Sequence, residues 1–228
     1  MIHGLILVPE ITKGMKSLGS KALLQIKKKI SVLEYQINSL LDIDKNIKIT
    51  VCSGFEHEKI SFLLNDKYSN NVNYVYNSEY KNTNQGYSIK LFFDTIYKKP
   101  NNILILNNGI ILKKKCLNKS MLGNESKIFI LNKKKEEFKL GCSSSKKLEY
   151  IFYDLPESWS ECIYLNTISI EVLQKIIEHS SINQMYLFEI INQVISDNSI
   201  TIEKEYIDKK MIMKVNTPKD ILKARYYI

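Results

Sequence analysis

The sequence predicts an α/β fold with a mostly parallel central sheet, and two patterns carry this prediction. Through the first half of the chain, short apolar runs of strand length alternate with segments in which apolar residues recur at helical spacing. Strands separated by helices imply right-handed crossovers and therefore parallel pairing. In addition, the run at residues 103–106 is wholly apolar, which is typical of a central strand that is buried on both faces.

Each element follows from a local pattern. The apolar run at residues 4–8 ends at Pro9, which favours a buried first strand. The apolar residues of segment 31–41 share one stripe, which predicts an amphipathic helix. The same reasoning gives strands at 47–52, 72–76 and 102–106, and helices at 56–65 and 86–97. In the less regular second half it gives strands at 127–131, 149–153, 162–165, 200–205 and 211–215, and a helix at 185–195.

Two features of the second half are read residue by residue. The segment Thr217-Pro218-Lys219-Asp220 predicts a helix start, because Thr217 can cap, Pro218 suits the first helical position and Asp220 can reach back. Trp159 follows a polar stretch and is predicted to lie partly buried in a loop between strands, where it could cover a pocket.

Composition limits the class of protein. The chain has 228 residues, of which 44% are hydrophobic and 25% charged, and it shows no repeat or linker, so we expect one globular domain over residues 1–228. Its apolar runs are far shorter than the about 20 residues that a membrane-spanning helix needs. The first residues lack a leader pattern. We therefore expect no membrane segment and no signal peptide.

The net charge of +9 comes almost wholly from lysine, since Arg225 is the only arginine. Arginine is the side chain that reads guanine and clamps phosphate, so specific recognition of nucleic acid is not favoured. Lysine clusters at 27–29, 113–115 and 133–135 each end an apolar segment. They are interpreted as solvated turns, with a nonspecific polyanion-binding surface as the alternative.

Cysteine and histidine indicate no metal site. The four cysteines, Cys52, Cys116, Cys142 and Cys162, are far apart and never at metal-ligand spacing, and the three histidines are scattered. Zinc is therefore not expected. Free thiols in a reducing compartment are the default for such a chain, which predicts a cytoplasmic location.

Four segments carry motifs in a fixed order. They are LILVPEITKGMKSLGSKALLQI; SVLEYQINSLL followed by IKITVCSGFEHEKISFLL; NSEYKNTNQGYSIKL; and the pair NILILNNGIIL and MKVNTPKDILKAR. In this order they resemble the nucleotidyltransferases of the GT-A-like fold, in particular the branch of choline-phosphate cytidylyltransferases and sugar-phosphate nucleotidylyltransferases. The resemblance implies a Rossmann-like three-layer fold. The activity it implies is transfer of a nucleoside monophosphate from a nucleoside triphosphate to a phosphorylated small molecule, with Mg²⁺ as cofactor.

The resemblance also assigns roles to single residues. Lys21, in SKALL, matches the phosphate-facing lysine of the family and is the candidate catalytic residue. Asn84 and Ser88 match the substrate-side motif of the choline-phosphate branch. Asn107 and Asn108, at the end of the fourth strand, are further candidates for substrate binding. The alternative for Asn84 and Ser88 is a purely structural helix N-terminus, and for Lys21 an exposed lysine.

The catalytic motifs are degenerate. Glu10 and Thr12 stand where the family's phosphate-binding loop has glycines. The two metal positions of the family fall on Gly109, which has no side chain, and on Asn216, which is uncharged. We expect these two residues to lie close together at the carboxyl ends of their strands, and we expect no metal there.

Three interpretations of function stay open. The first is a divergent or inactive nucleotidyltransferase-fold protein that acts by binding a nucleotide or phosphorylated small molecule, or by assembly with a protein partner or a second copy. The second is an active nucleotidyltransferase whose metal ligands come from Asp154, Glu157 and Glu161, the nearest spare carboxylates. The third is a structural or polyanion-binding module.

Overall fold

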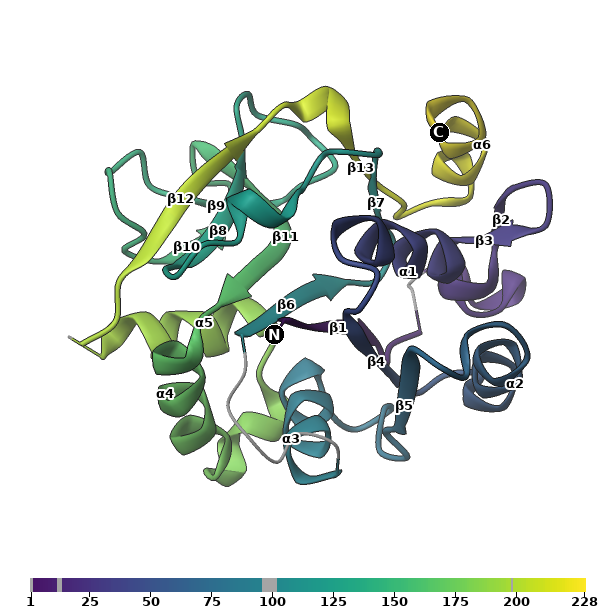
Figure 1. The fold of residues 1–228 in the computed structure, drawn as a ribbon, viewed down its shortest axis with the longest axis horizontal. Coiled ribbons are helices and arrows are strands. Elements are labelled where there is room, and N and C mark those ends of the chain that lie inside the picture. The colour runs from purple at the N-terminus through teal and green to yellow at the C-terminus, as the bar shows by residue number, and fades with distance from the viewer. Residues whose placement is uncertain (1, 12–13, 96–101, 198) are drawn as a thin grey trace.

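The computed structural model describes residues 2–11, 14–95, 102–197 and 199–228 (Figure 1). Within these residues nine strands form one sheet, and two short antiparallel pairs stand beside it. The strands of the sheet are β1 (Ile2–Val8), β4 (Lys48–Ser53), β5 (Val72–Tyr76), β6 (Asn102–Asn107), β8 (Ser126–Leu131), β9 (Leu140–Cys142), β10 (Ile151–Tyr153), β11 (Glu157–Leu165) and β12 (Ile202–Ile207). The short pairs are β2 (Gln25–Lys27) with β3 (Ile30–Ser31), and β7 (Ile110–Leu112) with β13 (Ile212–Lys214).

The first-half strands pair in parallel, as the sequence predicts. Strand β1 lies between β4 and β6, and β4 continues to β5, all three pairs being parallel. On its other side β6 pairs antiparallel with β11, which also pairs with β8 and β9. The predicted central position of segment 102–106 is therefore confirmed.

Helices cover both faces of the sheet and make three layers (Figure 1). The helices are α1 (Val32–Ile43), α2 (His57–Tyr68), α3 (Gln85–Thr95), α4 (Thr167–Ile177), α5 (Leu187–Ser196) and α6 (Pro218–Tyr227). Successive side chains of a strand point to opposite faces. Accordingly, Ile6 and Val8 share a core with α1 and α2, whereas Leu5 and Leu7 share one with α3, α4 and α5. The α/β class and the Rossmann-like architecture are confirmed.

Local signals explain several boundaries. Helix α1 begins after Ser31, whose side chain accepts a hydrogen bond from the backbone N–H of Glu34, while Glu34 accepts one from the backbone N–H of Ser31. This reciprocal pair satisfies two of the backbone donors that a helix start leaves free.

Residues 96 and 97 of the predicted helix 86–97 lie outside the described residues.

The prediction for Trp159 is wrong. Trp159 lies inside strand β11, is fully buried, and donates a hydrogen bond from Nε1 to the carbonyl of Cys162 at 2.9 Å. The polar segment before residue 162 resembles a loop in sequence, but it continues the strand through an irregularity between Trp159 and Ile163. Helix α4 and the short strands β7 and β9 were not predicted at all.

The predicted start of the last helix is confirmed. The Asp220 carboxylate accepts hydrogen bonds from the backbone N–H groups of Thr217, at 2.9 Å, and Asn216, at 3.1 Å. Replacing Asp220 by alanine removes this cap, so we expect the free energy of unfolding to fall by about 1 kcal/mol. Urea unfolding followed by circular dichroism measures the change. Lys219→Ala, at an exposed position of the same turn, is the control and should change it by less than about 0.5 kcal/mol.

Candidate ligand-binding site

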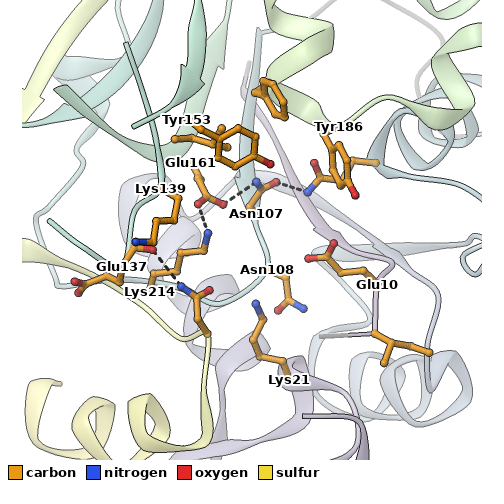
Figure 2. A pocket seen from close by; sticks show the side chains of 15 residues that line it. Glu10, Lys21, Asn107, Asn108, Glu137, Lys139, Tyr153, Glu161, Tyr186 and Lys214 are labelled. Atoms are coloured by element: carbon orange, nitrogen blue, oxygen red, sulfur yellow. Dashed lines mark hydrogen bonds and ion pairs between the residues drawn. The ribbon is translucent and has the colours of Figure 1, made fainter. Parts of the chain in front are cut away.

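A cavity of about 440 Å³ lies at the carboxyl end of β6, the central strand (Figure 2). This is the end of the sheet at which open α/β folds keep their ligand crevices. Six residues singled out in the sequence line it: Glu10, Lys21, Asn107, Asn108, Glu161 and Asn216. The fold thus brings together residues that are far apart in the chain.

Lys21 is the lysine that the resemblance marks as phosphate-facing. It is held at the start of a short 3-10 helix, Lys21–Leu23, and only 4% of its surface is exposed. Burial lowers the pKa of the Lys21 ammonium to about 8, and the nearby carboxylate of Glu10 opposes part of that shift. Within the described part of the chain the ammonium makes no hydrogen bond or ion pair. Lys21 is therefore a buried cation without a direct hydrogen-bond or ion-pair partner in the described residues, contrary to the alternative of an exposed lysine.

Asn107 is held in a continuous polar network. Its carbonyl oxygen Oδ1 accepts a hydrogen bond from Gln85 at 3.0 Å, and its Nδ2 donates one to Glu161 at 3.0 Å. Gln85 in turn accepts from the backbone N–H of Leu187 at the start of α5. Since both amide atoms of Asn107 are engaged, this side chain orients Glu161 and the cavity wall.

Glu161 is the buried carboxylate of the cavity, with 4% of its surface exposed. It lies at an irregular position of β11 with a backbone φ of 57°, which is unusual for a non-glycine residue. Such irregularities re-aim a side chain relative to the regular strand. The carboxylate forms an ion pair with Lys214, which also lines the cavity (Figure 2).

Asn108 differs from its neighbour Asn107. It is 3% exposed and lines the cavity, yet neither its amide nitrogen nor its amide oxygen has a hydrogen-bond partner in the described residues. Buried polar groups in folded proteins are nearly always paired, so each exception calls for an explanation. An amide with both ends free can donate to and accept from a bound ligand.

Aromatic side chains form another wall of the cavity. Tyr153, Tyr186 and Phe188 line it, with the rings of Tyr186 and Phe188 stacked at 6.2 Å and those of Tyr153 and Phe188 at 5.6 Å, edge to face. Aromatic faces can pack against a ring or an apolar part of a ligand. These residues, Gln85 and Lys214 were not predicted from the sequence, because nothing in a single sequence distinguishes them from core or surface positions.

Gly109 and Asn216 lie close together, as predicted from the two strand-end motifs. The backbone N–H of Val215 donates to the carbonyl of Gly109 at 2.9 Å, and β7 and β13, which follow and precede these residues, are paired. Of the two, only Asn216 lines the cavity, and its Nδ2 donates to the carbonyl of Glu137 at 3.1 Å. The side chains that line the cavity at the end of β6 belong to Asn107 and Asn108, not to position 109.

Asn84 and Ser88 lie elsewhere. The Asn84 amide donates to the carbonyl of Gln184 at 2.6 Å, and the fully buried Ser88 hydroxyl accepts from Asn77 at 3.1 Å. Neither lines the cavity as the described residues form it. Both contacts tie α3 to neighbouring segments, and the substrate-binding role of Asn84 and Ser88 stays a prediction.

The residues of the degenerate loop and the spare carboxylates lie partly in the cavity wall and partly elsewhere. Glu10 lines the cavity, whereas Thr12 lies outside the described residues. Among the spare carboxylates, Glu161 lines the cavity; Glu157 pairs with Lys204 at 2.8 Å. Asp154 is exposed and is not part of the cavity wall in the described structure.

Comparisons by sequence find no relative: no family model matches the chain, and no curated protein matches it. Solved structures do match. CTP:phosphocholine cytidylyltransferase from Streptococcus pneumoniae is similar with a TM-score of 0.78 and 18% identity, over 99% of this chain and 98% of that one. The inositol-1-phosphate CTP transferase from T. maritima is similar with a TM-score of 0.74 and 12% identity, over 99% and 95%. The nucleoside-diphosphate-sugar pyrophosphorylase from Vibrio cholerae RC9 is similar with a TM-score of 0.74 and 10% identity, over 96% and 99%.

Identities this low establish a shared fold and leave activity open. The match nevertheless extends over nearly the full length of each chain, so it includes both the parallel half of the sheet and the irregular half that holds Glu161 and Lys214. The fold that the four sequence motifs predicted is therefore present, and this chain has the fold of the nucleotidyltransferases.

Proposed function

We propose that the chain is one nucleotidyltransferase-like domain over residues 1–228. It binds a nucleotide or a phosphorylated small molecule in this cavity and does not transfer a nucleoside monophosphate. The observation that carries the proposal is the ion pair that occupies Glu161, the buried carboxylate of the cavity. Glu161 is already neutralised by Lys214, and the two positions where the family resemblance puts metal ligands hold Gly109 and the uncharged Asn216.

Nucleotidyl transfer depends on neutralising charge around the attacked phosphorus, and related chemistry uses Mg²⁺ held by carboxylate oxygens. The cavity does not fit such an ion. Its other carboxylates are Glu137, which pairs with Lys135 at 3.0 Å, and the exposed Glu10. Among the described residues no group of three His, Cys, Asp or Glu side chains is placed to hold a metal.

Binding is supported by three features of the same cavity. Lys21 offers an ammonium group with no direct partner in the described residues, Asn108 offers a free amide, and the aromatic wall offers a packing surface. A phosphate group would pair with the first two, and a base or another ring would pack on the third. Asn107, with both amide atoms engaged, would position rather than bind.

The active alternative requires Glu161 to leave Lys214 and act as a metal ligand. Nothing else favours it, because Glu157 is engaged by Lys204 and Asp154 does not line the cavity. The polyanion alternative is supported only by exposure: Lys28, Lys29, Lys114 and Lys115 lie at exposed turns.

The proposal includes a cytoplasmic location and association with a protein partner or a second copy. All four cysteines are buried free thiols, which supports the predicted reducing, cytoplasmic compartment. No helix in the described ranges is long and apolar enough to cross a membrane. Association with a protein partner or a second copy stays a prediction.

The test measures binding and transfer separately. Each of the four nucleoside triphosphates is titrated into the protein by calorimetry, and pyrophosphate release is followed with Mg²⁺ and a panel of phosphorylated acceptors, phosphocholine and sugar phosphates included. We expect saturable heat with at least one nucleotide or acceptor and no pyrophosphate. Turnover near one per second that a chelator abolishes would overturn the proposal, and so would the lack of any saturable binding.

The lowered pKa of Lys21 predicts a pH dependence of that binding. A bound phosphate favours the protonated ammonium, so affinity should be full well below pH 8 and fall as the pH rises through the pKa of about 8. Groups that act on Lys21 are Glu10, Lys214, Glu161 and Asp220. Titrating CTP between pH 7.5 and 9.5, where its phosphates stay ionised, should show a loss of up to roughly tenfold per pH unit. Lys21→Met should flatten the profile, and an equally steep profile in that variant would contradict the assignment.

A further inference from the structure

We propose that Lys21 and Asn108 form a metal-free phosphate subsite, in which the Lys21 ammonium supplies the positive charge that a divalent cation supplies in metal-dependent transferases. This inference rests on the proposed binding function and goes further, because it names the two groups that hold the phosphate and states that no metal takes part. It is argued from three observations on the described residues.

The first observation concerns the space beside Gly109. A Cβ atom placed on Gly109 would lie 2.9 Å from both Cε and Nζ of Lys21, and 2.7 Å from the carbonyl oxygen of Val215. The end of the Lys21 side chain therefore fills the room that a side chain at position 109 would need. The Lys21 ammonium thus lies at the place where the resemblance would put a metal-binding carboxylate.

The second observation is that this ammonium makes no hydrogen bond or ion pair with the described residues. Burying a charge without such a direct partner is costly. The carboxylates of Glu10, Glu161 and Asp220 act on Lys21 through their charge alone, and the two oxygens of Glu161 are engaged by Lys214 and Asn107. An anionic ligand would supply the direct partner.

The third observation is the free amide of Asn108. Leaving a buried donor or acceptor unpaired costs about 1–3 kcal/mol, and both polar atoms of Asn108 are unpaired. Figure 2 shows the Asn108 amide and the end of Lys21 directed toward the same part of the cavity. A phosphate there would accept from the ammonium and from Nδ2, and a ligand hydroxyl or phosphate-bound water would donate to Oδ1.

Glu10 is the charge that opposes this arrangement. It lines the same cavity, but it is exposed whereas Lys21 is buried. The charge of an exposed carboxylate is screened by water and salt, whereas that of a buried ammonium is screened much less. The local field at the subsite is therefore set by Lys21.

The experiment titrates two probes, CTP and inorganic pyrophosphate, into the full chain by calorimetry, once in EDTA and once in Mg²⁺. The decisive variant is Asn108→Asp, which keeps the shape of the side chain and places a carboxylate beside Lys21. Asn70→Asp makes the same change of charge at an exposed residue and is the control. Lys21→Met removes the ammonium itself, and thermal unfolding of every variant reports that it is folded.

We expect the wild-type affinities in EDTA and in Mg²⁺ to agree within about threefold. Asn108→Asp and Lys21→Met should each weaken binding in EDTA at least tenfold, about 1.4 kcal/mol, and Asn70→Asp should leave it unchanged. Wild-type binding that disappears in EDTA would overturn the metal-free subsite and leave the binding function standing. Full affinity in folded Asn108→Asp would likewise overturn it. Absence of binding to either probe in both buffers would overturn the subsite, and if no nucleotide or phosphorylated acceptor binds either, the proposed function fails as well.

Discussion

Lys214→Met is expected to lower the free energy of unfolding by about 3 kcal/mol, at the lower end of the range for breaking a buried ion pair. The change leaves the Glu161 carboxylate, whose side chain is 6% exposed, without its cation. The remaining hydrogen bond from Asn107 offsets a part of the cost. Urea unfolding monitored by circular dichroism gives the value.

A double substitution separates the ion pair from simple loss of packing. Glu161→Gln combined with Lys214→Met removes both charges, so it should recover at least half of the lost stability. Lys223→Met is the matched surface control, because the Lys223–Asp220 pair is 3.3 Å long with the lysine 70% exposed, and it should cost less than about 1 kcal/mol. A Lys214→Met loss no larger than that of Lys223→Met would show that the carboxylate is not held by this lysine.

Gly109→Ala is expected to lower the free energy of unfolding by about 2–4 kcal/mol, through backbone strain and crowding together. Gly109 has a φ of 85°, and an added Cβ would meet Val215 and Lys21 below 3 Å. Gly14→Ala isolates the strain, since Gly14 has a φ of 78° but open space around it. It should cost about 1 kcal/mol. Equal costs for the two variants would contradict the crowding at Gly109.

The same contacts would meet an aspartate at position 109. Restoring the family's residue there would therefore require Lys21 to move, and would not by itself rebuild a metal site.

The regular half of the fold could be predicted from the sequence because its apolar periodicity is clear. Strand β6 is apolar on both faces, and the helices that flank β1, β4 and β5 have a single apolar stripe each. This alternation of strands and helices predicts that the strands pair in parallel. Strand β11 was predicted to begin at 162 rather than at Glu157, since its first residues are polar and yet buried in an irregular strand. There the burial comes from tertiary packing, which no local pattern reports.

The cavity residues, too, could be predicted only in part from the sequence. The strand-end motifs placed Gly109 and Asn216 correctly near one another, although the contact is made beside the main sheet, where β7 and β13 form a short antiparallel pair. They did not distinguish the engaged Asn107 from the free Asn108, nor predict that Lys214 neutralises Glu161. Both depend on contacts between segments 22 or more residues apart, such as Gln85 with Asn107 and Lys214 with Glu161.

Phosphorus NMR of a single sample tests the central claim, binding without transfer, most directly. The sample holds the protein, CTP, phosphocholine and Mg²⁺, and its spectrum reports the bound nucleotide and any released pyrophosphate together. Losing even one preorganised group costs about a hundred- to a thousandfold in rate, and here the metal-binding carboxylates are missing. The account predicts shifted or broadened CTP resonances and no pyrophosphate signal over a day. A pyrophosphate resonance that grows with time, and disappears when EDTA replaces Mg²⁺, would contradict it.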